Sequence, residues 1–368
     1  MTASERKSLR AEWALPLCAL ILIAGWLCKP ALSTETVSDG AVGFGFVAFF
    51  IGALLAAIAA TRHAEHLAAR FGEPYGTLML TLSAISLEIA TVVTVMLHNA
   101  DNPTFGRDTM FSVVMIVLNG IIGVALLAGG LRHHEQSYNL RGANAFLSLL
   151  IPLATLALIW PNVTVTTGGG TLSPVQKIFL IVMSLLLYGA FMVIQTRTHT
   201  SFFVAEGEPI EHEHPPSQHG WPWHATLLIV YLVLVVLTAK LFALPLETGV
   251  DRLGLPLTVA GLAVAVLVLA PEGIAAIRAA RFNQMQRAMN IGLGTALSTI
   301  ALTVPAILLI DLTSGRTAVL GLGAADTMVL LLTFAVSMLT FSSGRTYAMQ
   351  GLVHLLLFLS YIVLIFSP

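Results

Sequence analysis

The sequence predicts an all-α polytopic membrane protein with about eleven transmembrane helices, and three observations lead to that class. First, 57% of the 368 residues are hydrophobic and only 10% are charged, whereas soluble domains carry about 25% charged residues. Second, the mean hydropathy is +0.87. Third, the chain repeatedly contains apolar stretches of the roughly 20 residues that a spanning helix needs. The net charge of −1 gives no electrostatic reason to expect a nucleic-acid partner.

The spanning segments are expected near residues 13–31, 41–62, 74–97, 110–131, 144–160, 174–195, 223–244, 255–279, 287–310, 326–342 and 347–366. The first segment follows the basic stretch MTASERKSLR, and a cleaved signal peptide is the alternative interpretation of it. It also contains both cysteines, Cys18 and Cys28. We interpret them as lipid-facing or core-facing thiols and not as a disulfide.

The basic residues orient these segments, because cytoplasmic loops carry an excess of Lys and Arg. With the N-terminus in the cytoplasm, the inner side receives twelve of the 18 basic residues, namely Arg6, Lys7, Arg10, Arg62, Arg70, Arg132, Arg141, Arg197, Arg278, Arg281, Arg287 and Arg345. The outer loops receive four, namely Lys29, Arg107, Arg252 and Arg316. Lys177 and Lys240 fall at outer helix ends, where long side chains can extend to the interface. The C-terminus is therefore expected outside.

The order of segments suggests one peripheral helix followed by two inverted five-helix repeats. The expected parts are residues 1–40 with the first helix, 41–195 as the first repeat, an acidic, His-rich cytoplasmic linker at 196–222, and 223–368 as the second repeat. Because five is odd, two such repeats have opposite orientations in the membrane, as in many secondary transporters.

Two glutamates occupy matching places in the second helix of each repeat. Glu88 follows Pro74 at nearly the same separation along the chain as Glu272 follows Leu257. Since an α-helix rises about 1.5 Å per residue, both glutamates are expected near the middle of the membrane. The remaining acidic residues are expected in loops or near helix ends. Since an ionised group at the bilayer centre costs about 2.5–3.5 kcal/mol, such residues are usually functional.

Two facing carboxylates can bind protons or one cation in turn, because like charges in a low-dielectric site cannot comfortably both stay ionised. A hard ion such as Ca²⁺, which takes six to eight oxygen ligands, suits them well. Pro271 precedes Glu272 and frees a backbone carbonyl one turn earlier as a further ligand. The alternative is that both glutamates are neutral, hydrogen-bonded structural acids.

Polar residues near the two glutamates are candidates for a supporting shell, and helix packing is the alternative role for each. They are Thr81, Ser83, Ser86, Asn119, Thr295, Ser298 and Thr299. Glu73 at a helix start, and Glu211 and Glu213 in the linker, are candidates for cation access or regulation. His63 and His66 are expected at a solvated helix end, and His354 is expected to be a packed, hydrogen-bonded histidine.

Two stretches resemble the signatures of the cation/proton exchanger branch of the calcium/cation antiporter superfamily, and within it the bacterial Cha type. They are RHAEHLAARFGEPYGTLML at 62–80, followed by Glu88, and APEGIAAIRAARFNQMQRAMNIGLGTALSTIALTVP at 270–305. Where many such exchangers have Gly-Asn, this chain has Ala84-Ile85 and Val268-Leu269. The resemblance implies that Glu88 and Glu272 bind the cation and the protons, and the missing amides allow Na⁺ or K⁺ to compete with Ca²⁺.

The expected function is therefore secondary active exchange of Ca²⁺, and also of Na⁺ or K⁺, for H⁺ by alternating access in a bacterial inner membrane. The expected partners are the lipid bilayer and inorganic cations, with no cofactor and no nucleic acid, and the oligomeric state stays open. An intramembrane enzyme that uses the glutamates as acid/base groups or metal ligands is one alternative. A cation channel is the other.

Overall fold

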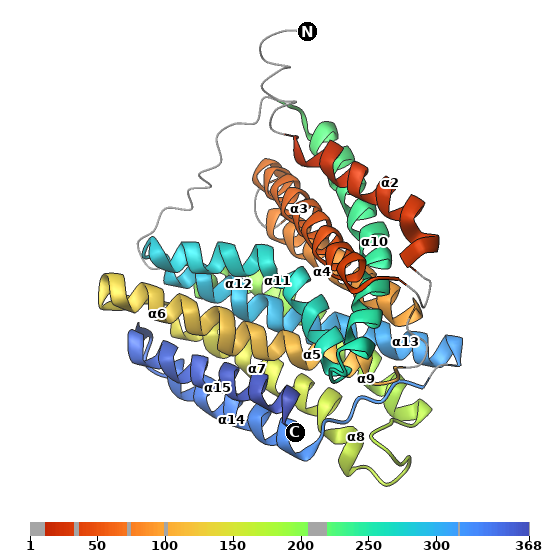
Figure 1. Cartoon of the computed structure of the whole chain (residues 1–368). Helices are drawn as coiled ribbons and strands as arrows, with labels where there is room; N and C mark the ends of the chain where they lie inside the picture. Colours follow the sequence, from red (N-terminus) through yellow and green to blue (C-terminus); the bar gives the residue numbers. More distant parts are fainter. Residues whose placement is uncertain are drawn as a thin grey trace. The chain divides into compact units, whose positions relative to one another are not determined.

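The computed structural model describes residues 12–32, 37–71, 75–98, 102–204, 219–315 and 317–367. These residues are mostly helical, and the chain divides into two compact units. Unit 1 comprises residues 1–99 and 213–255, and unit 2 comprises 100–212 and 256–368. Each unit takes helices from both halves of the sequence, as the colours along the chain show (Figure 1).

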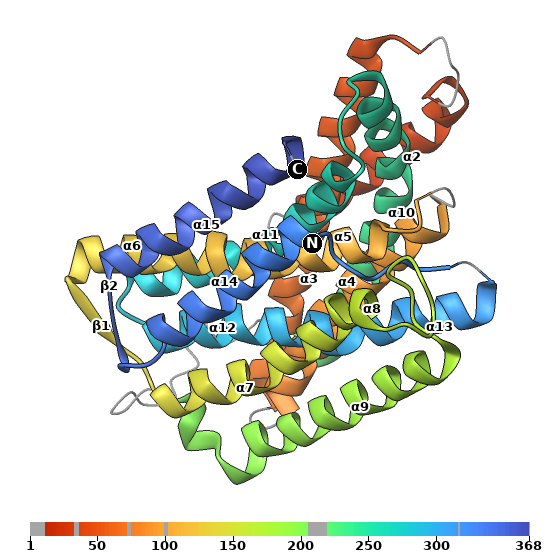
Figure 2. The ribbon, with the colours of Figure 1, turned by 90° about the horizontal axis from the view of Figure 1, so that it is seen from below.

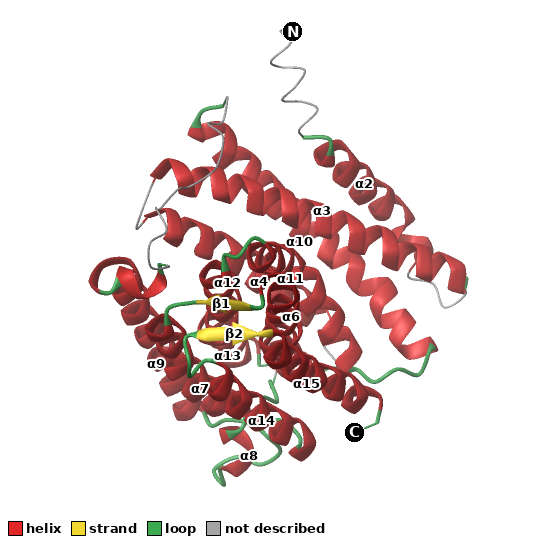
Figure 3. Ribbon diagram, turned by 90° about the vertical axis from the view of Figure 1, so that its left-hand side faces the viewer, coloured by secondary structure: helices red, strands yellow, loops and turns green. Residues whose placement is uncertain are grey.

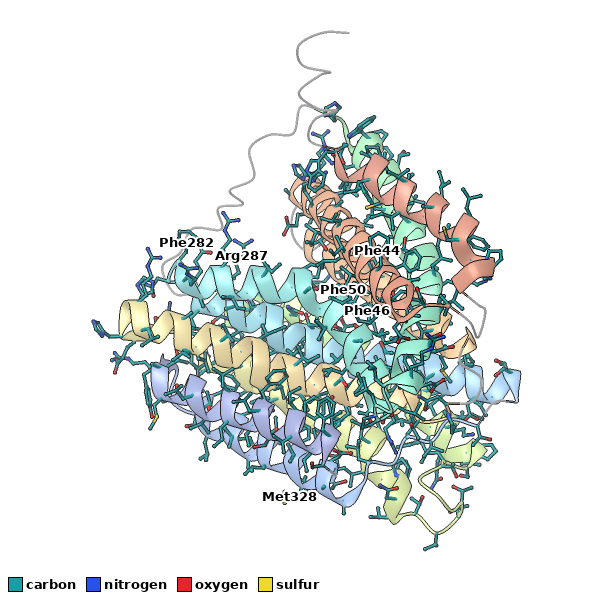
Figure 4. All side chains as sticks on the ribbon, in the orientation of Figure 1. Phe44, Phe46, Phe50, Phe282, Arg287 and Met328 are labelled. Atoms are coloured by element: carbon teal, nitrogen blue, oxygen red, sulfur yellow. The ribbon has the colours of Figure 1, made fainter. Side chains whose placement is uncertain are left out.

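Unit 1 contains α2 (Ala14–Leu32), α3 (Asp39–Phe71), α4 (Tyr75–His98) and α10 (Trp221–Arg252). Phe46 and Phe50 of α3 pack on Phe242 of α10, with ring centroids 5.1 and 5.9 Å apart (Figure 4). Arg252 Nη1 donates to Asp39 Oδ1 at 2.8 Å, so the end of α10 lies beside the start of α3. The two long helices are therefore antiparallel.

Unit 2 contains α5 (Phe105–Met115), η1 (Ile116–Ile121), α6 (Ile122–His133), β1 (Glu135–Ser137), α7 (Leu140–Leu158), α8 (Trp160–Val163), α9 (Pro174–Val193), η2 (Ile194–Thr198), η3 (Thr200–Phe203), α11 (Thr258–Arg281), α12 (Met285–Ser298), η4 (Thr299–Thr303), α13 (Val304–Ser314), α14 (Ala324–Thr340), β2 (Arg345–Tyr347) and α15 (Ala348–Phe366). The segments η1, η2 and η4 are π-helical. The runs α5–η1–α6 and α12–η4–α13 each form one long helix (Figure 1).

One end of unit 2, here called the hairpin end, gathers several connections between helices. The strands β1 and β2 pair there as an antiparallel two-stranded sheet, with Gln136 opposite Thr346 (Figure 3). The prediction of an all-α fold does not include this small sheet. Asn290 of α12 donates to the carbonyl of Phe203 at 2.6 Å, and the ring of His133 lies 3.0 Å from the Arg281 carbonyl. The connections after α6, η2, α11 and α14 therefore lie at the same end.

The remaining connections of unit 2 meet at the opposite end. The amide of Val319 donates to the carbonyl of Pro103 at 3.0 Å, and that of Gly321 donates to the carbonyl of Gly170, also at 3.0 Å. The connections before α5, before α9 and before α14 are thus joined by backbone hydrogen bonds. They are the ones expected outside, whereas those at the hairpin end are the ones expected inside.

These two ends fix the direction of each helix in unit 2. The helix α5–η1–α6 runs toward the hairpin end, and α12–η4–α13 runs away from it. The pairs α7 with α14 and α9 with α15 are likewise opposed, and Figure 2 shows all of them in one view. The third, fourth and fifth helices of the two sequence repeats therefore have opposite orientations, as inverted repeats require.

Among the described residues, eight helices are long and apolar enough to span a membrane. Three shorter apolar helices, at Ala14–Pro30, Ile85–Met96 and Ala324–Thr340, fall on the other expected segments. Large apolar side chains remain exposed on their outer faces, such as Met328, which projects from α14 (Figure 4). The class of all-α polytopic membrane protein is confirmed, and the number of eleven spans stays a prediction.

Candidate cation-binding site

Glu88 and Glu272 occupy equivalent places in two helices of equal length. Both α4 and α11 have 24 residues. Glu88 is the fourteenth residue of α4, counted from Tyr75, and Glu272 is the fifteenth residue of α11, counted from Thr258. The matching depth within each helix, which the sequence predicts, is therefore present. Glu88 belongs to unit 1 and Glu272 to unit 2, so the pairing of their carboxylates stays a prediction.

Glu272 has an unusual environment for a carboxylate. The helix α11 continues through Pro271, so the proline does not end it. Among the described residues, Oε2 of Glu272 is buried and has no hydrogen-bond partner. Pro271 also has no N–H to donate to the carbonyl of Leu267, one turn earlier. A buried acceptor without a donor costs about 1–3 kcal/mol, so a proton or a cation at Oε2 would remove a real penalty.

Two close contacts hold α11 in place, one near its start at Gly261 and one directly beside Glu272 at Gly273. A methyl group on Gly261 would lie 2.9 Å from the backbone nitrogen of Thr109 in α5. A methyl group on Gly273 would lie 3.1 Å from Ile121 in η1. Because neither position has room for a larger residue without movement, α11 lies directly against α5 and η1. Glu272 thus projects from a helix whose position is tightly defined.

Glu88 is also buried, with 4% of its surface exposed. Thr91, one turn later in α4, is fully buried and donates from Oγ1 to the Leu87 carbonyl at 2.8 Å. Ser83 is half-buried and Ser86 is exposed. The side chain of Thr81 lies outside the described part of α4. A supporting role for Thr81, Ser83 and Ser86 therefore stays a prediction.

Asn119 makes contacts that sequence reasoning did not foresee. Its Nδ2 donates to Oγ1 of Thr333 in α14 at 2.8 Å, and its Oδ1 lies 3.1 Å from Nδ1 of His354 in α15. Since a side-chain amide oxygen only accepts, His354 carries its proton on Nδ1. His354 Nε2 then accepts from the hydroxyl of Thr340 at 3.1 Å. His354 is the packed, hydrogen-bonded histidine that was predicted.

The candidates in the second repeat lie on either side of the junction between α12 and η4. Ser298 is buried and donates to the Thr295 carbonyl at 3.0 Å, and Thr295 itself is half-buried. Thr299, the first residue of η4, is fully buried. Their contact with a cation stays a prediction. The candidates Glu73, Glu211 and Glu213 lie outside the described residues.

Two buried ionic groups contradict the sequence expectations. His63, expected at a solvated helix end, is only 1% exposed and contacts His224 and Glu12. Lys177, expected to extend to the interface, is buried in an ion pair with Asp311. In both cases the partners come from distant segments of the chain, so local hydropathy carries no signal for the contact.

The helices, their inverted arrangement in unit 2 and the mid-helix acids are typical of ion-transporting membrane proteins. The family model "Sodium/calcium exchanger protein" matches residues 42–197 and 223–367, and the chain belongs to this family.

Curated relatives include the sodium-potassium/proton antiporter ChaA of Escherichia coli (strain K12), which is 37% identical over 96% of this chain and 95% of the relative. A Ca²⁺/H⁺ antiporter of Aphanothece halophytica is 28% identical over 61% of this chain and 69% of the relative. The family and these relatives are transporters, so the chain is a cation transporter and not an enzyme. The enzyme alternative is therefore wrong.

Solved structures confirm the fold. Native YfkE superposes with a TM-score of 0.75 and 16% identity, covering 96% of this chain and 100% of that one. The H⁺/Ca²⁺ exchanger CAX gives a TM-score of 0.69 with 15% identity, covering 98% of this chain and 89% of that one. At this level of identity the likeness shows the fold alone.

Proposed function

We propose that this protein exchanges Ca²⁺, and also Na⁺ or K⁺, for H⁺, with Glu88 and Glu272 binding the cation and the protons in turn. The observation that carries the proposal is the buried Oε2 of Glu272, which has no hydrogen-bond partner among the described residues. Glu88, buried at the matching place in the other repeat, is the natural second ligand. The names of two relatives, a sodium-potassium/proton antiporter and a Ca²⁺/H⁺ antiporter, support this range of cations.

The ligands follow from the chemistry of the two helices. Two carboxylates supply the negative charge that a divalent cation needs, and the Leu267 carbonyl freed by Pro271 can add a neutral oxygen. The amide of Asn119 is already bonded to Thr333 and His354, so in this arrangement it adds nothing to the cation. Water and the Ser and Thr hydroxyls predicted as a supporting shell are left to supply the remaining ligands. A shell with few side-chain oxygens is expected to discriminate weakly between Ca²⁺ and monovalent cations.

Coupled exchange requires that the protein change between its inward-open and outward-open states only when the binding site is filled. Two ionised carboxylates without a cation are costly in the low-dielectric interior, whereas one bound cation or bound protons remove that cost. The empty, charged form therefore does not cross, and cation movement is coupled to proton movement. With the arginine-rich hairpin end facing the cytoplasm, the N-terminus is inside, the C-terminus is outside, and the membrane is the bacterial inner membrane.

The test is cation-dependent proton flux in proteoliposomes that hold the purified full-length protein, with Ca²⁺, Na⁺, K⁺ and Mg²⁺ compared. Glu272→Gln and Glu88→Gln keep the side-chain shape but remove the charge, and each is expected to reduce exchange to the level of protein-free liposomes. Both variants should still insert, because removing a charge from the bilayer centre lowers a cost of about 2.5–3.5 kcal/mol.

Glu135→Gln is the matched control, because Glu135 is an exposed acid at the hairpin end. It should exchange cations at the wild-type rate. Wild-type exchange by either mid-helix variant would overturn the assigned roles. Cation flux that never drives protons uphill would instead identify a channel.

A further inference from the structure

Unit 1 contains a buried pair of histidines far along the sequence from either mid-helix glutamate. Nδ1 of His63, near the end of α3, lies 2.9 Å from Nδ1 of His224, at the start of α10. Their exposed fractions are 1% and 7%. Because α3 and α10 are antiparallel, this contact joins them at the end opposite the Arg252–Asp39 ion pair.

Glu12, in the segment just before α2, completes the cluster. Its side chain is buried, and Oε2 lies 3.4 Å from Nε2 of His63. Arg62 Nη2 lies 2.7 Å from both carboxylate oxygens, and the hydroxyl of Tyr231 donates to Oε2 at 2.9 Å. Three separate segments of the chain therefore meet at one carboxylate and two imidazoles.

The geometry fixes where the ring protons lie. Two ring nitrogens 2.9 Å apart form a hydrogen bond only if one carries a proton and the other does not. Glu12 accepts from His63 Nε2–H, so the neutral His63 has its lone pair on Nδ1. His224 then donates from Nδ1–H. With both rings neutral, one proton lies between the two Nδ1 atoms and their hydrogen bond is formed.

The hydrogen bond between the two rings exists only while one proton, and not two, lies between the Nδ1 atoms. A proton added at Nδ1 of His63 would make two N–H groups face each other at 2.9 Å. The two rings would then separate, and the contact between the ends of α3 and α10 would be lost.

The charged and titratable groups that face the pair come from several elements of unit 1. They are Glu12 before α2, Arg62 and His66 of α3, His219 just before α10, and Tyr231 of α10. The ring of His66 stacks on that of His224 at 4.6 Å. Arg62 and Glu12 form an ion pair at 2.7 Å.

A metal ion fits this cluster poorly. The guanidinium of Arg62 lies against both oxygens of Glu12, where it would repel a cation. In the part of the chain that the structure describes, no three His, Cys, Asp or Glu side chains are placed to hold a metal. The ligand that suits a hydrogen-bonded imidazole pair beside a carboxylate is a proton.

We propose that His63, His224 and Glu12 form a second proton-binding site, separate from the two mid-helix glutamates, and that a proton at Nδ1 of His63 opens this end of α3 and α10. The site would let the protein respond to pH on the membrane side where its N-terminus lies. Its effect on transport rests on the function proposed above, whereas the binding of the proton does not.

Binding is tested by ¹⁵N nuclear magnetic resonance of histidine-labelled, full-length protein in lipid bilayers over a pH series. In the wild type the two rings should titrate as a coupled pair, in two steps separated by more than about one pH unit. His224→Asn keeps a donor near the position of Nδ1 but cannot titrate, so His63 should then titrate in a single step. His63→Asn gives the reciprocal result and covers the case in which one variant fails to fold.

The control is His133→Asn, which alters a histidine of unit 2 at the end of α6. It should leave both steps unchanged. Independent titration of His63 and His224 in the wild type, with the same midpoints as in the single variants, would overturn the proposed site.

The transport arm measures exchange rate against pH on the N-terminal side of proteoliposomes. The wild type and His133→Asn should show an inflection that is lost in His224→Asn and in Glu12→Gln. An inflection that persists in His224→Asn would overturn the regulatory role. Absence of exchange in every protein, wild type included, would overturn the proposed function, and the resonance experiment would then decide the proton site by itself.

Discussion

The buried ion pair between Lys177 of α9 and Asp311 of α13 allows a direct test of how buried charges contribute to the stability of unit 2. Both side chains are buried, and the pair joins the fifth helix of one repeat to the third helix of the other. Asp311 has a second role, because its Oδ2 accepts the backbone N–H of Ala318 at 2.7 Å. The carboxylate therefore also holds the start of the connection from α13 to α14.

The expected costs follow from these contacts. Lys177→Met leaves the Asp311 charge buried without its partner and should destabilise the fold by about 3–5 kcal/mol. Asp311→Asn keeps an acceptor for the N–H of Ala318 but leaves the Lys177 charge buried without a partner. It should destabilise the fold by a similar amount, about 3–5 kcal/mol. The double variant removes both charges and keeps that acceptor. It should lie within about 1 kcal/mol of the wild type, since replacing a whole buried pair is often neutral or stabilising.

Equilibrium unfolding in mixed micelles, titrated with a denaturing detergent and followed by tryptophan fluorescence, measures these differences. The control is Arg345→Gln, which removes an exposed ion pair with Glu135 whose N···O distance is 3.4 Å. It should cost no more than about 1 kcal/mol. If the double variant loses the sum of the two single losses, the reasoning from buried charge is wrong.

Three further substitutions test the packing of α15 in the same unfolding assay, with a fourth, in α9, as their control. Gly351→Ala should destabilise by about 1–3 kcal/mol or more, because its new methyl group would lie 2.5 Å from a backbone nitrogen of α6; Gly189→Ala, with no atom within 4 Å, should be neutral or slightly stabilising. His354→Leu leaves the buried Oδ1 of Asn119 without its donor and should cost about 1–3 kcal/mol. Tyr361→Phe removes a 2.6 Å hydrogen bond to α5 and should cost about 0.5–1.5 kcal/mol. Equal losses at Gly351 and Gly189 would contradict the close approach of α6 and α15.

Hydropathy located the helices well but not always their ends. The segment expected at 41–62 continues in the structure to Phe71, and the one expected at 223–244 continues to Arg252. In α3 the apolar run ends but the following residues, rich in Ala, Leu and Arg, still favour a helix, whereas α10 continues through Pro245 and Gly249, which do not favour one. An apolar window therefore marks the membrane-spanning part of a helix and not its full length.

Local sequence patterns do not predict contacts between segments that lie far apart in the chain. The strands β1 and β2 are too short for an alternating pattern to show, and they come from opposite halves of the chain. His63 lies in the same helix as the expected solvated end, yet its burial depends on His224 and Glu12 from other segments. The mid-helix glutamates were found because a charge inside an apolar run is visible locally.

The π-helical turns η1 and η4 change which neighbours the residues beyond them face. A π turn holds one residue more than an α turn allows, so residues beyond it are rotated by about 100° from where α-helical spacing would place them. In α5–η1–α6, Ile121 faces Gly273 of α11, beside Glu272, whereas Asn119 reaches α14 and α15.

The second repeat has its π turn, η4, in the corresponding long helix. The sequences IVLNGI and TIALT of the two turns share no obvious pattern, so packing and not local sequence must place them. Candidate ligands that are grouped by uninterrupted α-helical spacing are therefore assigned unreliably beyond each turn. Glu88 and Glu272 are not affected, because each lies on an α-helix without such a turn.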